Sequence, residues 1–175
     1  MVPEKKITVE DVKYVLSSHY QGTPYDPYAS YGDKAQRGAF RSIGVNRTDF
    51  LSVIQMRPGM EKDSNILEWV AFASNAFNVL VPFYATIDTT PDYFSSTTRE
   101  VTTDSFYWVS RIIGAMADAS YRSSVFHIER YQESVMAKGH QLINQYDALL
   151  EKESDAAKRM ALRQEANQAI ADMLK

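Results

Sequence analysis

Residues 68–84 read Glu-Trp-Val-Ala-Phe-Ala-Ser-Asn-Ala-Phe-Asn-Val-Leu-Val-Pro-Phe-Tyr, the most apolar and aromatic stretch of the chain. Its two halves, Leu67 to Ala73 and Phe77 to Tyr84, are rich in β-branched and aromatic residues and have the length of strands. The Ser74-Asn75-Ala76 segment between them is typical of a turn. A continuous helix is the rival interpretation, but Pro82 would remove a backbone donor and clash with the preceding turn. We therefore predict two strands at the centre of the fold.

The composition is that of one ordinary globular domain. Of the 175 residues, 45% are hydrophobic and 23% are charged, as in ordinary soluble proteins. A chain of this length can bury a core without disulfides or a metal. The net charge of −3, with both signs interspersed, creates no field that would attract nucleic acid or an anionic membrane. The sequence also lacks a long apolar run and a signal-peptide core. We expect a single cytoplasmic domain over residues 1–175, without nucleic-acid or membrane partners.

A helix and one or two further strands are predicted before this central stretch. Thr8 and Asp11 resemble a capping box with the shorter acid, which predicts a first helix ending near Tyr20. The segment from Asp49 to Arg57 is predicted to be a strand, and Ser42 to Asn46 is a candidate for one more. Three or four strands in direct succession, joined by short connections, favour an antiparallel sheet.

A run of helices is predicted after the sheet, beyond a polar loop over residues 86–104 whose length is typical of functional loops. Thr103 or Asp104 is expected to cap a helix, and a longer one follows beyond Tyr121. Residues 155–175 are predicted to form a weakly hydrophobic, peripheral helix. This order of elements predicts an α+β fold with helices on one face of the sheet.

The histidines and glycines match no catalytic or cofactor-binding motif. His19, His127 and His140 are far apart and have no carboxylates at metal-ligand spacing. His19 follows two serines, but neighbours on a helix cannot take up the geometry of a catalytic triad. The glycines match neither the dinucleotide-binding nor the P-loop pattern. The sequence therefore predicts neither a metal nor a cofactor.

Two asparagines and two arginines are candidates for binding a substrate. Asn75 and Asn78, at the end of a core strand, could donate hydrogen bonds to an oxyanion or to a substrate backbone. Alternatively, they serve only to form the turn. Arg41 and Arg47 could pair with a substrate carboxylate, although isolated arginines are more often surface charges.

Four stretches resemble one known family, the bacterial C69 dipeptidases. They are Leu-Ser-Ser-His-Tyr-Gln-Gly-Thr-Pro-Tyr-Asp-Pro-Tyr (16–28), Ile-Gly-Val-Asn-Arg (43–47), the stretch from Trp69 to Tyr84, and Thr-Asp-Ser-Phe-Tyr-Trp-Val-Ser-Arg (103–111). The resemblance follows the chain in order through about residues 7–150, which makes it more specific than a single motif. The last helix lies outside it.

The resemblance implies an N-terminal nucleophile hydrolase with an αββα sandwich. In this family a cysteine at the mature N-terminus is the nucleophile, its α-amino group is the base, and no metal or cofactor takes part. The present chain contains no cysteine, so it lacks the reacting group. The resemblance therefore implies the C-terminal portion of a larger dipeptidase, inactive alone, with the nucleophile in a missing N-terminal part.

Tyr20, Asn75 and Asn78 lie in the best-matching stretches, and the resemblance makes them candidates for binding the dipeptide. No catalytic residue is expected in this chain. The alternative is a non-catalytic module that binds peptides or a partner protein through its Tyr-rich loop, residues 21–33, and an exposed sheet. A sheet face or edge left uncovered would favour self-association of the isolated chain.

Overall fold

The strand expected at the centre of the molecule is β2 (Ile66–Phe72), and it lies between β1 (Phe50–Met56) and β3 (Val81–Tyr84). A computed structural model describes residues 4–175. Both pairings are antiparallel, with Val53 opposite Trp69 and Trp69 opposite Pro82. The prediction of antiparallel strands is confirmed, and Pro82 lies in the edge strand β3, where a proline is tolerated. The expected strand from Phe77 to Tyr84 is shorter, because it begins only at Val81.

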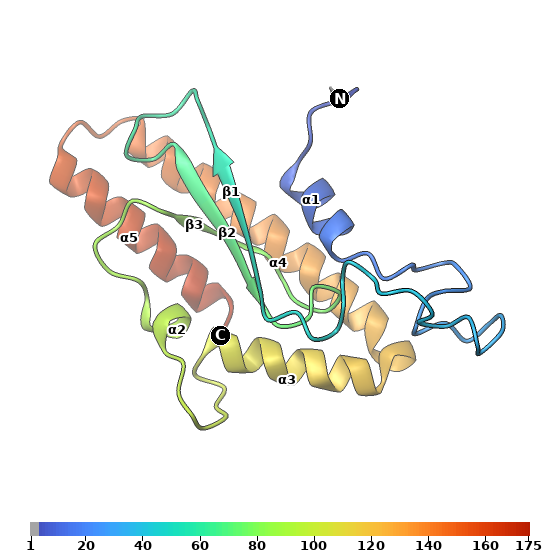
Figure 1. The fold of residues 1–175 in the computed structure, drawn as a ribbon. Coiled ribbons are helices and arrows are strands. Elements are labelled where there is room, and N and C mark those ends of the chain that lie inside the picture. The colour runs from blue at the N-terminus through green and yellow to red at the C-terminus, as the bar shows by residue number, and fades with distance from the viewer. Residues whose placement is uncertain (1–3) are drawn as a thin grey trace.

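The helices frame this sheet (Figure 1). They are α1 (Val9–Leu16), α2 (Asp92–Ser95), α3 (Phe106–Ala119), α4 (Tyr121–Leu150) and α5 (Ala156–Met173). The capping box is present: the Thr8 side chain accepts from the Asp11 backbone, and the Asp11 carboxylate accepts from the Thr8 N–H at 2.9 Å. Helix α1 ends at Leu16, short of the expected Tyr20. The α+β class, with antiparallel strands followed by helices, is confirmed and is consistent with part of an αββα sandwich.

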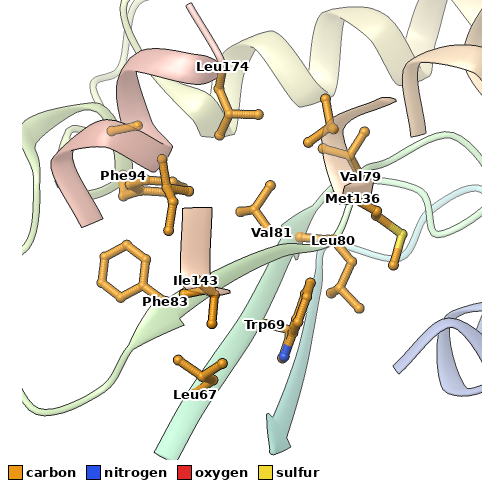
Figure 2. Packing of buried hydrophobic residues seen from close by; sticks show 14 of the residues in the cluster. Leu67, Trp69, Val79, Leu80, Val81, Phe83, Phe94, Met136, Ile143 and Leu174 are labelled. Atoms are coloured by element: carbon orange, nitrogen blue, oxygen red, sulfur yellow. The ribbon is translucent and has the colours of Figure 1, made fainter. Parts of the chain in front are cut away.

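One face of the sheet packs against α4. The Trp69 ring lies 4.8 Å from the His140 ring, and Pro82 lies against Gly139. A Cβ at Gly139 would come within 2.8 Å of Pro82 Cδ, so glycine is what allows α4 to approach β3 this closely. Figure 2 shows the resulting core, in which Trp69 of β2 lies near Met136 and Ile143 of α4. Burial of such side chains is the main stabilising contribution to the fold.

The opposite face of the sheet is only partly covered. Phe72 packs edge-on against Phe106 of α3 with the ring centroids 5.5 Å apart, and Phe83 packs against Phe94 of α2 at 5.0 Å. Helices therefore contact both faces, and not the single face expected. Large apolar side chains on the β1 side remain exposed: Phe50 (51%), Ile54 (67%) and Met56 (78%).

Two local expectations are wrong. Residues 42–46 form no strand, because Gly44 packs against the end of α1 and donates its N–H to Ser18 O at 2.8 Å. A Cβ at Gly44 would meet the Ser17 carbonyl, so this close approach requires glycine. The N-cap of α3 is Ser105, whose side chain makes no capping hydrogen bond, and neither Thr103 nor Asp104 occupies that position.

The helix expected to be peripheral, at residues 155–175, is instead part of the core. Asn167 and Ile170 of α5 are fully buried. The Asn167 side chain accepts from Tyr84 N at 2.9 Å and donates to Tyr84 O at 3.0 Å, so it occupies backbone groups that edge strand β3 would otherwise leave free. The hydrophobicity of the sequence did not predict the burial of this helix, because several of its buried side chains are polar and are hydrogen-bonded to other parts of the chain.

Candidate functional site

The turn between β2 and β3, residues 73–80, is the structural centre of the candidate site. It is closed by hydrogen bonds from Phe77 N and Asn78 N to Ser74 O, at 2.9 and 2.8 Å. Ala73 enters the turn with φ of 65°, a left-handed conformation that is unfavourable for a residue with a Cβ. Such strain costs about 1–3 kcal/mol and persists only where the surrounding contacts hold it.

Asn75 and Asn78 lie together inside this turn, 5% and 4% exposed. The Asn78 amide nitrogen donates to Ala73 O at 2.9 Å and to Asn75 Oδ1 at 3.3 Å. Asn75 donates in turn to Leu16 O, at the end of α1, at 3.1 Å. Both side chains therefore point into the protein, where they hold the turn together and attach it to α1.

Lys13 of α1 completes this cluster. Its buried ammonium donates to Asn78 Oδ1 at 2.7 Å, to Ser17 Oγ at 2.9 Å and to the Asn75 carbonyl. Ser17 Oγ donates to the same Asn75 carbonyl at 2.7 Å. Burial lowers the pKa of Lys13 to about 7, even though three oxygen acceptors surround its nitrogen. We call Lys13, Ser17, Asn75 and Asn78 the lysine–asparagine cluster.

Lys13 was not among the predicted site residues, although the sequence contains a signal for it. Lys13 lies four residues after Val9 and three before Leu16, so it falls on the apolar stripe of α1. A lysine in that position is buried only if its nitrogen finds partners. Ser17 lies only four residues away, but the other two partners, the asparagines of the turn, lie 62 and 65 residues away in the sequence.

Tyr20 lies apart from the two asparagines. Its backbone has φ of 63°. Its ring packs edge-on against Tyr25, with the centroids 6.3 Å apart, and lies tilted against Phe40 at 6.4 Å. Arg41 and Arg47, considered as carboxylate ligands, are exposed on the same loop. Of the residues predicted to bind substrate, the structure brings together Asn75 and Asn78, and the other three lie elsewhere.

A groove of about 710 Å³ between α1 and α4 borders one side of the turn. Ala76 and Phe77 of the turn contribute to its wall, as do Lys13 and Ser17. Phe77 belongs to a small aromatic cluster in which Tyr28 of the Tyr-rich loop stacks on Tyr121 at 4.3 Å. We call this hollow the α1–α4 groove.

Histidines lie at two positions along the α1–α4 groove. His140 pairs with Glu10 at 2.6 Å, and although partial burial opposes it, this hydrogen bond lowers the pKa of Glu10. His19 is buried, with its Nε2 3.3 Å from Tyr121 Oη. Both histidines thus make specific contacts, whereas His127 is exposed.

A second hollow of about 390 Å³ borders the other side of the turn, next to α3. Ala73 and Ser74 of the turn form part of its wall, and Arg111, Gly114 and Asp118 of α3 contribute to the rest. We call it the α3 cleft. The turn that carries Asn75 and Asn78 therefore separates two hollows, and any change in the turn alters the walls of both.

Residues 4–175 contain neither a cluster of metal-binding side chains nor a helix suited to crossing a membrane. No group of three or more histidine, aspartate or glutamate side chains in this part of the chain could hold a metal ion. None of its helices is long and apolar enough to cross a membrane.

Comparison with known proteins places the chain among the peptidases. The family model described as "Peptidase family C69" matches residues 1–134. The chain belongs to peptidase family C69, and the family resemblance seen in the sequence is confirmed.

Several relatives are similar along most of the chain. A "Dipeptidase" of Bifidobacterium longum (strain NCC 2705) is 52% identical over 141 residues, which are 81% of this chain and 26% of the relative. A "Probable dipeptidase A" of Streptococcus pyogenes serotype M18 (strain MGAS8232) is 46% identical over 85% of this chain and 31% of the relative. A "Probable dipeptidase B" of Lactococcus lactis subsp. lactis (strain IL1403) is 36% identical over 96% of this chain and 35% of the relative. The chain thus spans about a quarter to a third of the length of these relatives.

Proposed function

We propose that this chain is the C-terminal part of a dipeptidase that hydrolyses dipeptides through a cysteine nucleophile and an acyl-enzyme intermediate. The observation that carries the proposal is membership of peptidase family C69 together with relatives named as dipeptidases. Because the chain contains no cysteine and corresponds to 26–35% of those relatives, the nucleophile would come from the remaining part of the protein. The isolated chain is then inactive.

In this proposal the chain contributes to the substrate side of the active site, with Tyr20, Asn75 and Asn78 as the residues concerned. The amides of Asn75 and Asn78 are occupied by hydrogen bonds inside the protein. The two asparagines therefore act by holding the turn at residues 73–80 in its strained conformation, and the backbone and small side chains of that turn face the substrate. Tyr20 acts separately, through the aromatic surface it forms with Tyr25 and Phe40.

The test is Ala-Ala hydrolysis by the 175-residue chain, beside a longer polypeptide that joins it to the corresponding preceding segment of the Bifidobacterium relative. We expect hydrolysis by the longer form only, abolished by replacing its N-terminal cysteine with alanine. Hydrolysis by the short form would mean that a serine or threonine of this chain performs the reaction, and would overturn the proposal. No hydrolysis by either form would favour a peptide- or protein-binding module.

The substrate-side assignment is tested in the active longer form with Tyr20→Ala, Asn75→Ala and Asn78→Ala, each expected to raise KM or lower kcat. Asn144→Ala, an exposed asparagine of α4, is the matched control. Wild-type kinetics for all three variants would remove these residues from the proposed site.

A further inference from the structure

Two oppositely charged side chains of α3 border the α3 cleft. Arg111 and Asp118 are seven residues apart, which is about two helical turns, so they lie on the same face of α3 about 10 Å apart along its axis. Between them the cleft is lined by Gly114, which packs against Ala73 of the turn, and by the small, exposed side chain of Ala115. The cleft thus has a positive and a negative end.

Asp118 at one end has no cationic partner among residues 4–175. Tyr28 Oη donates to its carboxylate at 2.5 Å and Asn46 Nδ2 at 3.3 Å, and both donors are neutral. No lysine, arginine or histidine within residues 4–175 forms an ion pair with it. Asp118 is also next to the last residue of α3, where the helix dipole disfavours a negative charge. A cation bound here would relieve this unfavourable placement.

Arg111 at the other end has a partner that is easily exchanged. Its guanidinium is 2.8 Å from Asp49, a carboxylate that is 70% exposed, and such surface pairs contribute little. Its Nε donates to Tyr107 Oη at 3.2 Å, which orients the guanidinium plane. The remaining N–H groups can bind a carboxylate in the forked geometry that arginine favours.

Ser74 supplies an independent sign that a polar ligand belongs in the cleft. The residue is 4% exposed and lies on the cleft wall, and its Oγ has no hydrogen-bond partner within the described part of the chain. A buried hydroxyl without a partner is uncommon and costs free energy. A polar atom of a bound ligand would satisfy it once a rotation about χ1 turned the hydroxyl toward the cleft.

We propose that the α3 cleft binds the two charged ends of a dipeptide, with Asp118 taking the α-ammonium group and Arg111 taking the α-carboxylate. In an extended dipeptide these groups are about 6–7 Å apart, given about 3.8 Å between successive Cα atoms. One hydrogen-bond length of about 3 Å at each end makes the span to be bridged about 12–13 Å. Because the Arg111 side chain extends toward Tyr107, away from Asp118, its guanidinium lies farther from Asp118 than the separation of about 10 Å between the two backbone positions, which leaves room for a ligand of this span. Each further residue would add about 3.5 Å, so the cleft selects dipeptides over longer peptides.

This inference rests on the proposed function for the identity of the ligand, but binding can be measured without hydrolysis. The experiment is a calorimetric titration of the 175-residue chain with Ala-Ala, N-acetyl-Ala-Ala and Ala-Ala-amide. We expect saturable binding of Ala-Ala and binding about tenfold or more weaker for either blocked peptide, since each has lost one charge-assisted contact. Absence of saturable Ala-Ala binding, or equal affinity for all three peptides, would overturn the inference.

Two variants assign each end of the ligand. Asp118→Asn should weaken Ala-Ala binding about tenfold but leave the affinity for N-acetyl-Ala-Ala unchanged. Arg111→Gln should also weaken Ala-Ala binding about tenfold but leave the affinity for Ala-Ala-amide unchanged. Glu129→Gln, which changes a carboxylate of the α1–α4 groove, and the exposed Arg122→Gln are matched controls. Thermal unfolding of each variant monitors its folding. A loss of binding in Glu129→Gln but not in Asp118→Asn would place the ligand in the groove and refute the proposal.

The outcomes separate this inference from the proposed function. Charge-dependent binding of Ala-Ala by the chain, with no hydrolysis by the longer form, would keep the cleft assignment and reject the dipeptidase. Hydrolysis by the longer form with wild-type KM in both Asp118→Asn and Arg111→Gln would keep the dipeptidase and reject the cleft assignment.

Discussion

At the scale of single residues, polar side chains buried beside apolar ones organise the candidate site. Lys13 joins α1 to the turn at residues 73–80 because its nitrogen is surrounded by oxygens of Ser17, Asn75 and Asn78. The sequence was enough to propose Asn75 and Asn78, because they are amides at the end of a core strand and lie in a stretch that resembles the family, and their role at the substrate stays a prediction. It was not enough to select Lys13, since the type of a residue does not say whether distant acceptors will surround it.

The buried Lys13 predicts a dependence of stability on pH. Its folded pKa of about 7 lies below the ordinary value of 10.5, so the unfolded chain binds more protons between these two values. The contribution of Lys13 to the free energy of unfolding is therefore flat below pH 7 and rises above it, by up to about 1.4 kcal/mol per pH unit.

The measurement is urea unfolding at pH 6, 7 and 8.5 for the wild type, Lys13→Met and the exposed-lysine control Lys138→Met. The stability of the wild type relative to Lys13→Met should increase by about 1–2 kcal/mol from pH 7 to pH 8.5. The control should follow the wild type. Parallel pH profiles for all three proteins would show that Lys13 keeps its ordinary pKa.

At the scale of secondary-structure elements, α5 shows how a helix of low hydrophobicity becomes part of the core. Asp63, between β1 and β2, lies 2.6 Å from Arg159 and 2.6 Å from Arg163 of α5. The hydrogen bond from Arg159, together with the charge of Arg163, lowers the pKa of Asp63 to about 2. Ion pairs and the contacts of Asn167 with Tyr84 thus hold α5 against the sheet. The apolar pattern of the sequence does not predict these contacts.

Replacing Asp63 should loosen this attachment. Asp63→Asn leaves two largely buried guanidinium groups without their carboxylate and should lower the free energy of unfolding at pH 7 by about 2 kcal/mol or more. Asp88→Asn, at an exposed aspartate, is the control. Because the folded pKa of Asp63 is lowered, its contribution is present above pH 4 and is lost as the pH falls toward 2. Chemical unfolding at pH 3 and pH 6 should therefore show a smaller difference between wild type and Asp63→Asn at pH 3; an equal difference would contradict this assignment.

At the scale of the whole molecule, the sheet has one face buried by α4 and another that is partly open. Phe50, Ile54 and Met56 of β1 are more than half exposed, and Ile66 of β2, which is opposite Met56, is 37% exposed. Strand β1 is also an edge of the described sheet. Exposed apolar patches and free edges of this kind promote association.

We therefore predict that the isolated chain self-associates through the β1 side of the sheet. Light scattering over a range of protein concentrations should show a rising average mass, and the double variant Ile54→Lys/Met56→Lys should reduce it. Phe126→Lys, at an exposed apolar residue of α4, is the control and should associate like the wild type. A monomer at high concentration would contradict the prediction.

The sequence by itself determined the elements with regular apolar patterns and the family. The strands around Trp69, the capping box at Thr8, the long helix beyond Tyr121 and the C69 resemblance all follow from residues close together in the chain, where periodicity and local sterics act. Only the tertiary structure decided which polar residues pair with one another. Lys13 and Asn75, Asp63 and Arg163, and Asp118 and Tyr28 are hydrogen-bonded pairs whose members are 62, 100 and 90 residues apart. Such pairs form only when the chain folds, and burying a polar group is costly unless it finds a partner.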